Sequence, residues 1–83
     1  MNKKITVKTP HGKVCYAVFD KERSDSEQIC ELFGIDGEHG ISVEFQGEQI
    51  VVTDYYHAEP MAEFDILSID DTDLPVSLKW NEI

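Results

Sequence analysis

Apolar and polar residues alternate in two segments near the start of the chain. Ile5 and Val7 alternate with polar neighbours over residues 4–9, which is the period of a half-buried strand. A largely apolar segment follows over residues 14–19. The sequence Pro10-His11-Gly12 between the two segments favours a tight turn, because Gly12 accepts a positive φ without strain. The pattern predicts a β-hairpin.

The spacing of apolar residues then changes to that of a helix. Ser24 and Glu27 have the spacing of a capping box, in which the Ser24 hydroxyl accepts a hydrogen bond from the Glu27 backbone N–H. Gly34 suits the residue that ends a helix, because it takes the left-handed conformation freely. These signals predict a helix over residues 25–33. Its apolar stripe, expected to pack on a sheet, consists of Ile29, Leu32 and Phe33, with Cys30 at its edge.

Four apolar segments follow the helix. Residues 41–46 alternate with period two, and Gly47 separates them from residues 50–53, which predicts a second hairpin. Residues 64–69 and 76–80 are predicted as the fifth and sixth strands.

Two polar segments are expected to connect these strands. Residues 54–60 are expected to form a loop, because Pro60 cannot donate to the ladder of a central strand. The acidic residues from Asp70 to Asp73 are expected to form a turn before Pro75. The order ββαββββ predicts a single α+β domain over residues 1–83. Its short connections predict a mostly antiparallel sheet of about five to six strands with one short helix packed on one face. A small, partly open β-barrel with one helix is the alternative.

Charge is distributed very unevenly along the 83 residues, whose formal net charge is −10. Residues 1–23 hold six of the seven lysines and arginines, whereas residues 24–83 hold fifteen acids and one base, Lys79. An ordinary surface mixes both signs, which relieves self-repulsion. The sequence therefore predicts one continuous negative surface, with the lysines of residues 3–13 on a different face. The alternative is that the acidity serves only solubility.

The length and composition disfavour several classes of protein. A chain this short buries only about 60–65% of its unfolded surface, which leaves little room for a deep substrate cavity. The longest apolar runs are far below the roughly 20 residues of a membrane span, and no apolar segment follows the N-terminal lysines as in a signal peptide. We therefore expect a cytoplasmic protein that is not an enzyme and does not contact a membrane.

Metal and cofactor sites find no support in the spacing of the ligand-type residues. Asp70, Asp71 and Asp73 lack the glycine that an EF-hand loop needs at its sixth position. His39, His57 and Glu59 do not have the spacing of a zinc site. We expect no metal and no cofactor.

Nucleophilic catalysis and nucleic-acid binding are equally weak as interpretations. Cys15 and Cys30 lie on an apolar strand and on the helix stripe, so both are expected to be buried, inert thiols, with a bridge between them left open. The chain has no GxSxG, phosphate-loop or HExxH motif. The acidic remainder of the chain would repel a phosphate backbone, so direct binding of DNA or RNA is not expected.

The acidic residues themselves are the remaining candidates for a site. Glu63 and Asp65 alternate with apolar residues, so their carboxylates are expected to share the outer face of a strand, about 6.7 Å apart, which is the scale of successive phosphates along a nucleic-acid strand. Tyr56 is expected to be an exposed aromatic anchor beside them. The full set of predicted partner-binding residues is Glu44, Tyr56, Glu63, Asp65, Asp70, Asp71 and Asp73.

The size, the acidity and the motif-free α+β layout resemble the broad group of phage and mobile-element inhibitors that imitate nucleic acid, including anti-restriction and anti-CRISPR proteins. Immunity proteins that neutralise nuclease toxins are similar in the same respects. The resemblance covers charge and size, and no shared motif carries residues over. It implies an inhibitor that occludes the basic nucleic-acid-binding site of a partner protein. The alternative function is a non-catalytic accessory or structural subunit.

Overall fold

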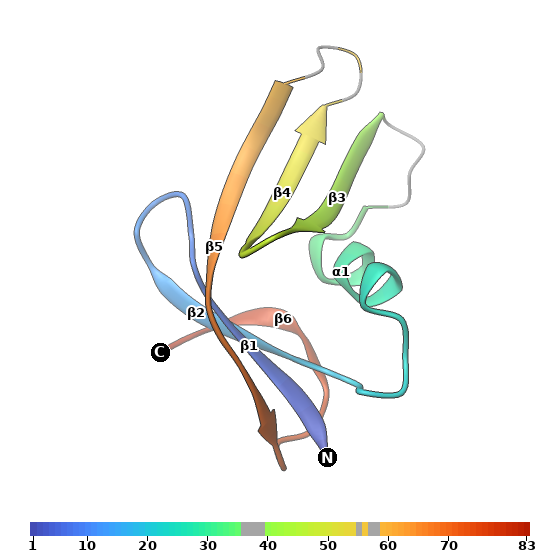
Figure 1. The fold of residues 1–83 in the computed structure, drawn as a ribbon, viewed down its shortest axis with the longest axis vertical. Helices are drawn as coiled ribbons and strands as arrows, with labels where there is room; N and C mark the ends of the chain where they lie inside the picture. Colours follow the sequence, from blue (N-terminus) through green and yellow to red (C-terminus); the bar gives the residue numbers. More distant parts are fainter. Residues whose placement is uncertain (36–39, 55, 57–58) are drawn as a thin grey trace.

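The computed structural model describes residues 1–35, 40–54, 56 and 59–83. The elements follow the predicted order ββαββββ. In chain order they are β1 (Asn2–Lys8), β2 (Val14–Phe19), α1 (Asp25–Phe33), β3 (Ile41–Gln46), β4 (Gln49–Asp54), β5 (Glu59–Thr72) and β6 (Ser77–Glu82). The fold is α+β, as predicted (Figure 1).

The strands form one six-stranded antiparallel sheet in the order β3-β4-β5-β1-β2-β6. β5 is the long central strand, and it changes partner along its length. Its first half pairs with β4 from Glu59 to Asp65, and its second half pairs with β1 from Asp65 to Thr72. Among the described residues, each half of β5 therefore has a strand on one side only.

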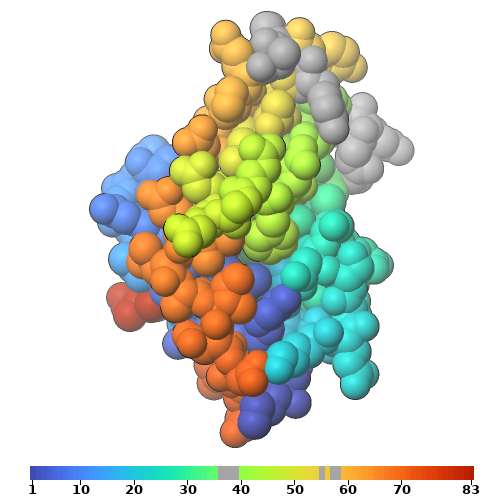
Figure 2. Space-filling model, viewed as in Figure 1, coloured from blue at the N-terminus to red at the C-terminus, as the bar shows by residue number. Residues whose placement is uncertain are grey.

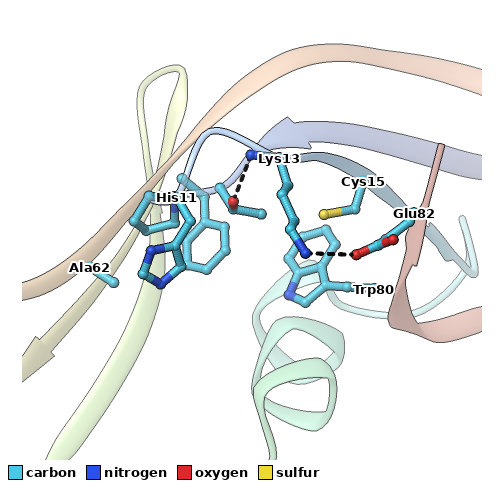
Figure 3. Close-up of a pocket in the computed structure, with 9 residues that line it drawn as sticks. His11, Lys13, Cys15, Ala62, Trp80 and Glu82 are labelled. Atoms are coloured by element: carbon cyan, nitrogen blue, oxygen red, sulfur yellow. Dashed lines mark hydrogen bonds and ion pairs between the residues drawn. The ribbon is translucent and has the colours of Figure 1, made fainter.

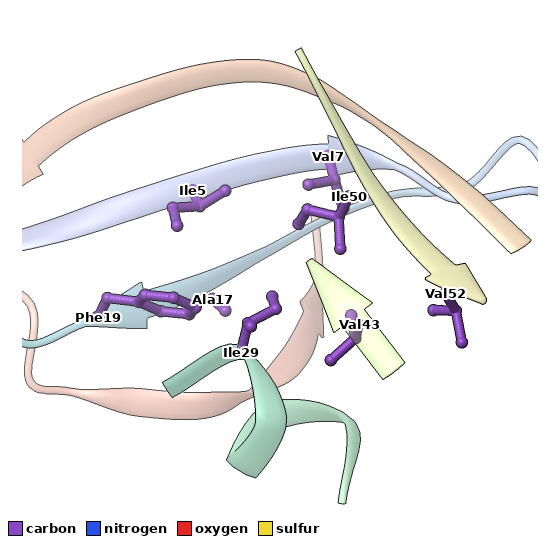
Figure 4. Packing of buried hydrophobic residues seen from close by; sticks show 8 residues of the cluster. All are labelled: Ile5, Val7, Ala17, Phe19, Ile29, Val43, Ile50 and Val52. Carbon is purple, nitrogen blue, oxygen red and sulfur yellow. The ribbon is translucent and has the colours of Figure 1, made fainter. Parts of the chain in front are cut away.

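The core lies between the sheet and α1. The helix contacts β3 and β6, which are the two edge strands of the sheet, so the sheet curls around it (Figure 1). The buried apolar side chains come from four strands and the helix, and Figure 4 shows how they converge: Ile5, Val7, Ala17, Phe19, Ile29, Val43, Ile50 and Val52. The sheet stays open, and the alternative of a small barrel is wrong in that respect.

The helix has the predicted ends and the predicted buried face. The Ser24 side chain accepts a hydrogen bond from the Glu27 N–H at 3.4 Å, and Gly34 has a φ of 67°. Ile29 is fully buried, while Leu32 and Phe33 are half-buried against the core. The helix stripe is therefore confirmed, with Ile29 as its centre.

A buried glutamine that the sequence pattern did not indicate fixes the helix to β2. Gln28 is fully buried, and its side-chain oxygen accepts a hydrogen bond from the Asp20 N–H at 2.7 Å. Its side-chain nitrogen donates to the carbonyl oxygens of Asp20, at 2.9 Å, and of Arg23, at 3.4 Å. Gln28 thus binds the backbone of the connection between β2 and α1.

The predicted limits of β5 are wrong at both ends. β5 begins at Glu59 and ends at Thr72, so Pro60 lies in a strand and Asp70 and Asp71 do not form a turn. Pro60 is tolerated because it lies beside a register shift and in the half of β5 that has no partner on the β1 side. The two aspartates continue the strand because they pair with β1. In the described part of the chain, no helix is long and apolar enough to cross a membrane.

Candidate binding surfaces

The strands β3, β4 and the first half of β5 present a carboxylate-bearing face on the side of the sheet away from the core. Antiparallel partners point to the same face, so the register Glu44↔Val51↔Glu63 forms one row across the three strands. The next row is Gln46↔Gln49↔Asp65. Glu44, Glu63 and Asp65, three of the predicted partner-binding residues, therefore share this surface, which we call the acidic face.

The carboxylates of the acidic face point into solvent. Glu44, Glu63 and Asp65 are exposed, and the described part of the chain brings no lysine or arginine within ion-pair distance of them. The Gln49 side-chain amide donates to Asp65 Oδ1 at 3.0 Å, which holds that carboxylate in place. On its other side Asp65 is paired in register with Lys8, so the acidic face ends at β1.

Most cations of the protein are engaged away from the acidic face, and Lys8 lies opposite Asp65 at its border. Arg23 binds two helix carboxylates, those of Glu27 and Glu31, at 3.6 and 3.0 Å. The other ion pairs among the described residues are Lys3–Asp25, Lys13–Glu82 and Lys21–Asp71. Lys4 lies 4.7 Å from the centre of the Tyr16 ring. The positive charge is thus concentrated on β1, β2 and their connection to the helix.

The predicted single negative surface, separated from the N-terminal lysines, is wrong. The second half of β5 pairs with β1, which places Asp70 opposite Lys4 and Asp71 opposite Lys3. Lys21 binds the Asp71 carboxylate and holds its pKa below the usual value. The acids of β5 therefore divide into a group beside β4, with Lys8 opposite Asp65 at its border, and a group interleaved with lysines beside β1.

Asp73 and Tyr56 lie apart from both groups. Asp73 lies in the loop that follows β5. The Asn2 side chain donates a hydrogen bond to the Leu74 carbonyl of this loop at 2.9 Å. Tyr56 follows β4 and is 80% exposed. Its ring lies against Gly40, which has a φ of 69° and has no space for a side chain there. Tyr56 is thus exposed, as predicted, but it lies beyond the end of β4 and not beside Glu63 and Asp65.

A second candidate site is a hollow of about 590 Å³ between the β1–β2 turn, β5 and β6. Figure 3 shows its rim, where Lys13 Nζ binds Glu82 Oε1 at 3.3 Å on one side and the exposed ring of His11 lies on the other. Phe64 and Trp80 line its apolar wall, with stacked rings whose centroids are 5.7 Å apart. The sequence pattern did not reveal this hollow, because it joins residues from both ends of the chain.

Cys15 lines the hollow but does not have the properties of a nucleophile. Its side chain is 4% exposed, and burial raises the pKa of the thiol above its usual value. The Glu82 carboxylate raises that pKa further, while Lys13 opposes the rise. Both cysteines are free thiols, and Cys30 is half-buried rather than buried as predicted. The hollow can hold an apolar group, and it does not activate Cys15 for attack.

Neither ligand geometry nor similarity to other proteins identifies a site. Among the described residues, no three histidine, cysteine or acidic side chains are grouped as metal ligands, and His39 and His57 lie outside those residues. No protein-family model, curated protein or solved structure matches the chain.

Proposed function

We propose that this protein is a small acidic binding module that occludes the basic nucleic-acid-binding site of a partner protein. The observation that supports this function best is the acidic face. Residues 41–65, which include all of β3 and β4, hold six acids and no lysine or arginine. Glu44, Glu63 and Asp65 are the three of these acids that the register places together on one surface.

The sheet holds these carboxylates at spacings that suit a cleft for a charged polymer. Glu63 and Asp65 are two residues apart on one strand, which separates their backbones by about 6.7 Å. Glu44 lies two strands away from Glu63, a separation of about 10 Å. Hydrogen bonds between the strands already order the backbone that carries these carboxylates. Little backbone entropy is therefore lost when a partner binds, which lowers the entropic cost of association.

The placement of the cations supports the same function. Arg23 and three lysines are bound to carboxylates elsewhere in the protein. Lys8 lies opposite Asp65 at the border of the acidic face, but among the described residues no ion pair joins the two. A basic protein that approaches is attracted over about 8–10 Å at physiological ionic strength and meets the acidic face without having to displace an internal cation.

The accessory-subunit alternative remains a competing proposal, and one observation favours it. Asp70 and Asp71 alternate with lysines across β1 and β5, as on an ordinary soluble surface. The two functions differ in what they require of the acidic face. Only an inhibitor of a basic site loses its partner when the charge of that face is reversed.

A capture experiment with two charge-matched variants tests the proposal. The wild-type protein, Glu63→Lys/Asp65→Lys and Glu22→Lys/Glu31→Lys serve as bait for a cell lysate at low and high salt; Glu22 and Glu31 are exposed on the β2–α1 connection and on the helix. Both variants change the net charge equally, but only the first changes the acidic face. We expect the wild type and the second variant to capture, at low salt only, a nucleic-acid-binding protein that duplex DNA or RNA then displaces. Capture that survives the reversal of Glu63 and Asp65, or that nucleic acid leaves unchanged, would overturn the proposal.

A further inference from the structure

The second half of β5 has an open backbone edge. β4 pairs with β5 only up to Asp65, and one further hydrogen bond joins the Ile66 N–H to the Glu48 carbonyl at 2.8 Å. From Leu67 to Thr72, β5 has β1 on one side and no strand of the described chain on the other. About half of the backbone N–H and C=O groups of such a segment point away from its single partner and remain available for hydrogen bonds.

This edge also exposes aliphatic side chains. Leu67 is 53% exposed and Ile69 is 51% exposed. Residues 67–71 are all exposed, and successive strand residues point to opposite faces, so this segment has exposed side chains on both of its faces. Figure 2 shows this part of β5, in orange, on the surface of the molecule. The register with β1 shifts here, so Leu67 has no cross-strand partner.

The first half of β5 has an open edge on the side towards β1, but this edge is protected against the addition of a further strand, whereas the edge of the second half is not. Pro60 lies in that first half and has no N–H to offer to an incoming strand. Residues 67–72 contain no proline. An open, proline-free edge with exposed aliphatic side chains is the surface to which extended peptides add in β-augmentation.

We propose that residues 67–72 of β5 bind an extended, basic segment of a partner protein as an additional strand of the sheet. The identity of the occupant follows from the side chains along the edge. Ile69 lies in the row of Ile5 and Asp70 lies in the row of Lys4, so the added strand needs an apolar residue beside Ile69 and a basic residue beside Asp70. This proposal takes the basic character of the partner from the proposed function.

Charge also decides between a basic segment and a second copy of this chain. Two copies that paired through this edge would each carry a net charge of −10. They would also bring together carboxylates that flank the edge and have no ion pair among the described residues, those of Asp65, Asp70 and Asp73. Like charges on adjacent strands are destabilising, whereas lysines or arginines on an added strand would lie beside these carboxylates.

A peptide titration tests this edge without the natural partner. The probe is a short, capped peptide of alternating lysine and valine, and the control peptides replace lysine with glutamate or carry N-methylated amides. We expect the basic peptide to bind and to slow amide hydrogen exchange within residues 67–72 only. Leu67→Ser/Ile69→Ser should weaken its binding about tenfold or more. Met61→Ser is the matched control, because Met61 is 58% exposed on the paired half of the same strand.

Each result has a definite meaning for the edge. Equal binding of the N-methylated peptide, protection outside residues 67–72, or an unchanged affinity of the Leu67/Ile69 variant would overturn the proposal. A concentration-dependent dimer that the same variant abolishes in sedimentation would show that a second copy covers the edge, and would also overturn it. Glu63 and Asp65 are unchanged in these variants. If the peptide does not bind the edge, the proposed function of the acidic face is therefore still tested separately by the capture experiment.

Discussion

Replacing Gln28 with leucine removes the hydrogen bonds that join the helix to the end of β2 but keeps a side chain of similar size. The Asp20 N–H and the Asp20 carbonyl then lose partners at 2.7 and 2.9 Å, and the weaker bond to Arg23, at 3.4 Å, is lost as well. A buried polar group left without a partner costs about 1–3 kcal/mol. Because the residues of this connection are only partly buried, we expect a total loss of about 2–4 kcal/mol.

That loss is large for a domain of this size. At about 0.05–0.15 kcal/mol per residue, 83 residues give a free energy of unfolding of about 4–12 kcal/mol. Urea denaturation followed by circular dichroism measures the difference between Gln28→Leu and the wild type. Gln46→Leu is the control, because Gln46 is exposed on β3, and it should change the stability by less than about 0.5 kcal/mol. An equally small change for Gln28→Leu would refute the role given to Gln28.

Three further predictions concern the core, an ion pair and a thiol. Ile29→Ala should cost about 2–5 kcal/mol in urea denaturation, and Leu32→Ala should cost less, because only Ile29 is fully buried; the reverse order would contradict the packing. Lys21 lowers the pKa of Asp71 in the folded protein. The ion pair between them therefore stabilises the fold above the pKa that Asp71 has in the unfolded chain, and this stabilisation is lost as the pH falls through the pKa that Asp71 has in the folded protein. Lys21→Gln should therefore be less stable than the wild type near pH 7, with a difference that fades as the pH falls through the lowered pKa of Asp71. A pH-independent difference would count against this ion pair. Cys15 should react with iodoacetamide more slowly than the half-buried Cys30, because burial and the Glu82 carboxylate raise the pKa of Cys15. Mass spectrometry of the labelled protein measures both rates, and equal rates would contradict the burial of Cys15.

The helix was predictable to the residue because its signals are local. Ser24 and Gly34 mark its two ends, and the spacing of Ile29, Leu32 and Phe33 gives its buried face. Gln28 was missed because a polar residue beside an apolar stripe normally faces solvent. Gln28 is buried because it binds the backbone of residues 20–23. The spacing of apolar residues in the helix does not predict where that backbone lies.

The partners of β5 were not predictable from local pattern. The acidic residues Asp70 and Asp71 favour a turn when taken alone. They nevertheless continue β5, because they pair with β1, which comes from the opposite end of the chain. The same long-range pairing placed Lys3 and Lys4 opposite these acids and divided the expected negative surface. The grouping of Glu44, Glu63 and Asp65 was predictable in part, because alternation defines one face of each strand before the order of the strands is known.

The most direct test of the acidic face is the association rate of the protein with the partner that the capture experiment yields, measured against salt concentration. If the acidic face steers the encounter, the rate falls steeply with salt for the wild type. Glu63→Lys/Asp65→Lys should then associate about tenfold or more slowly at low salt, while Glu22→Lys/Glu31→Lys stays closer to the wild type. A rate that is independent of salt and equal in the three proteins would contradict the account and would favour an accessory subunit whose acidity serves solubility.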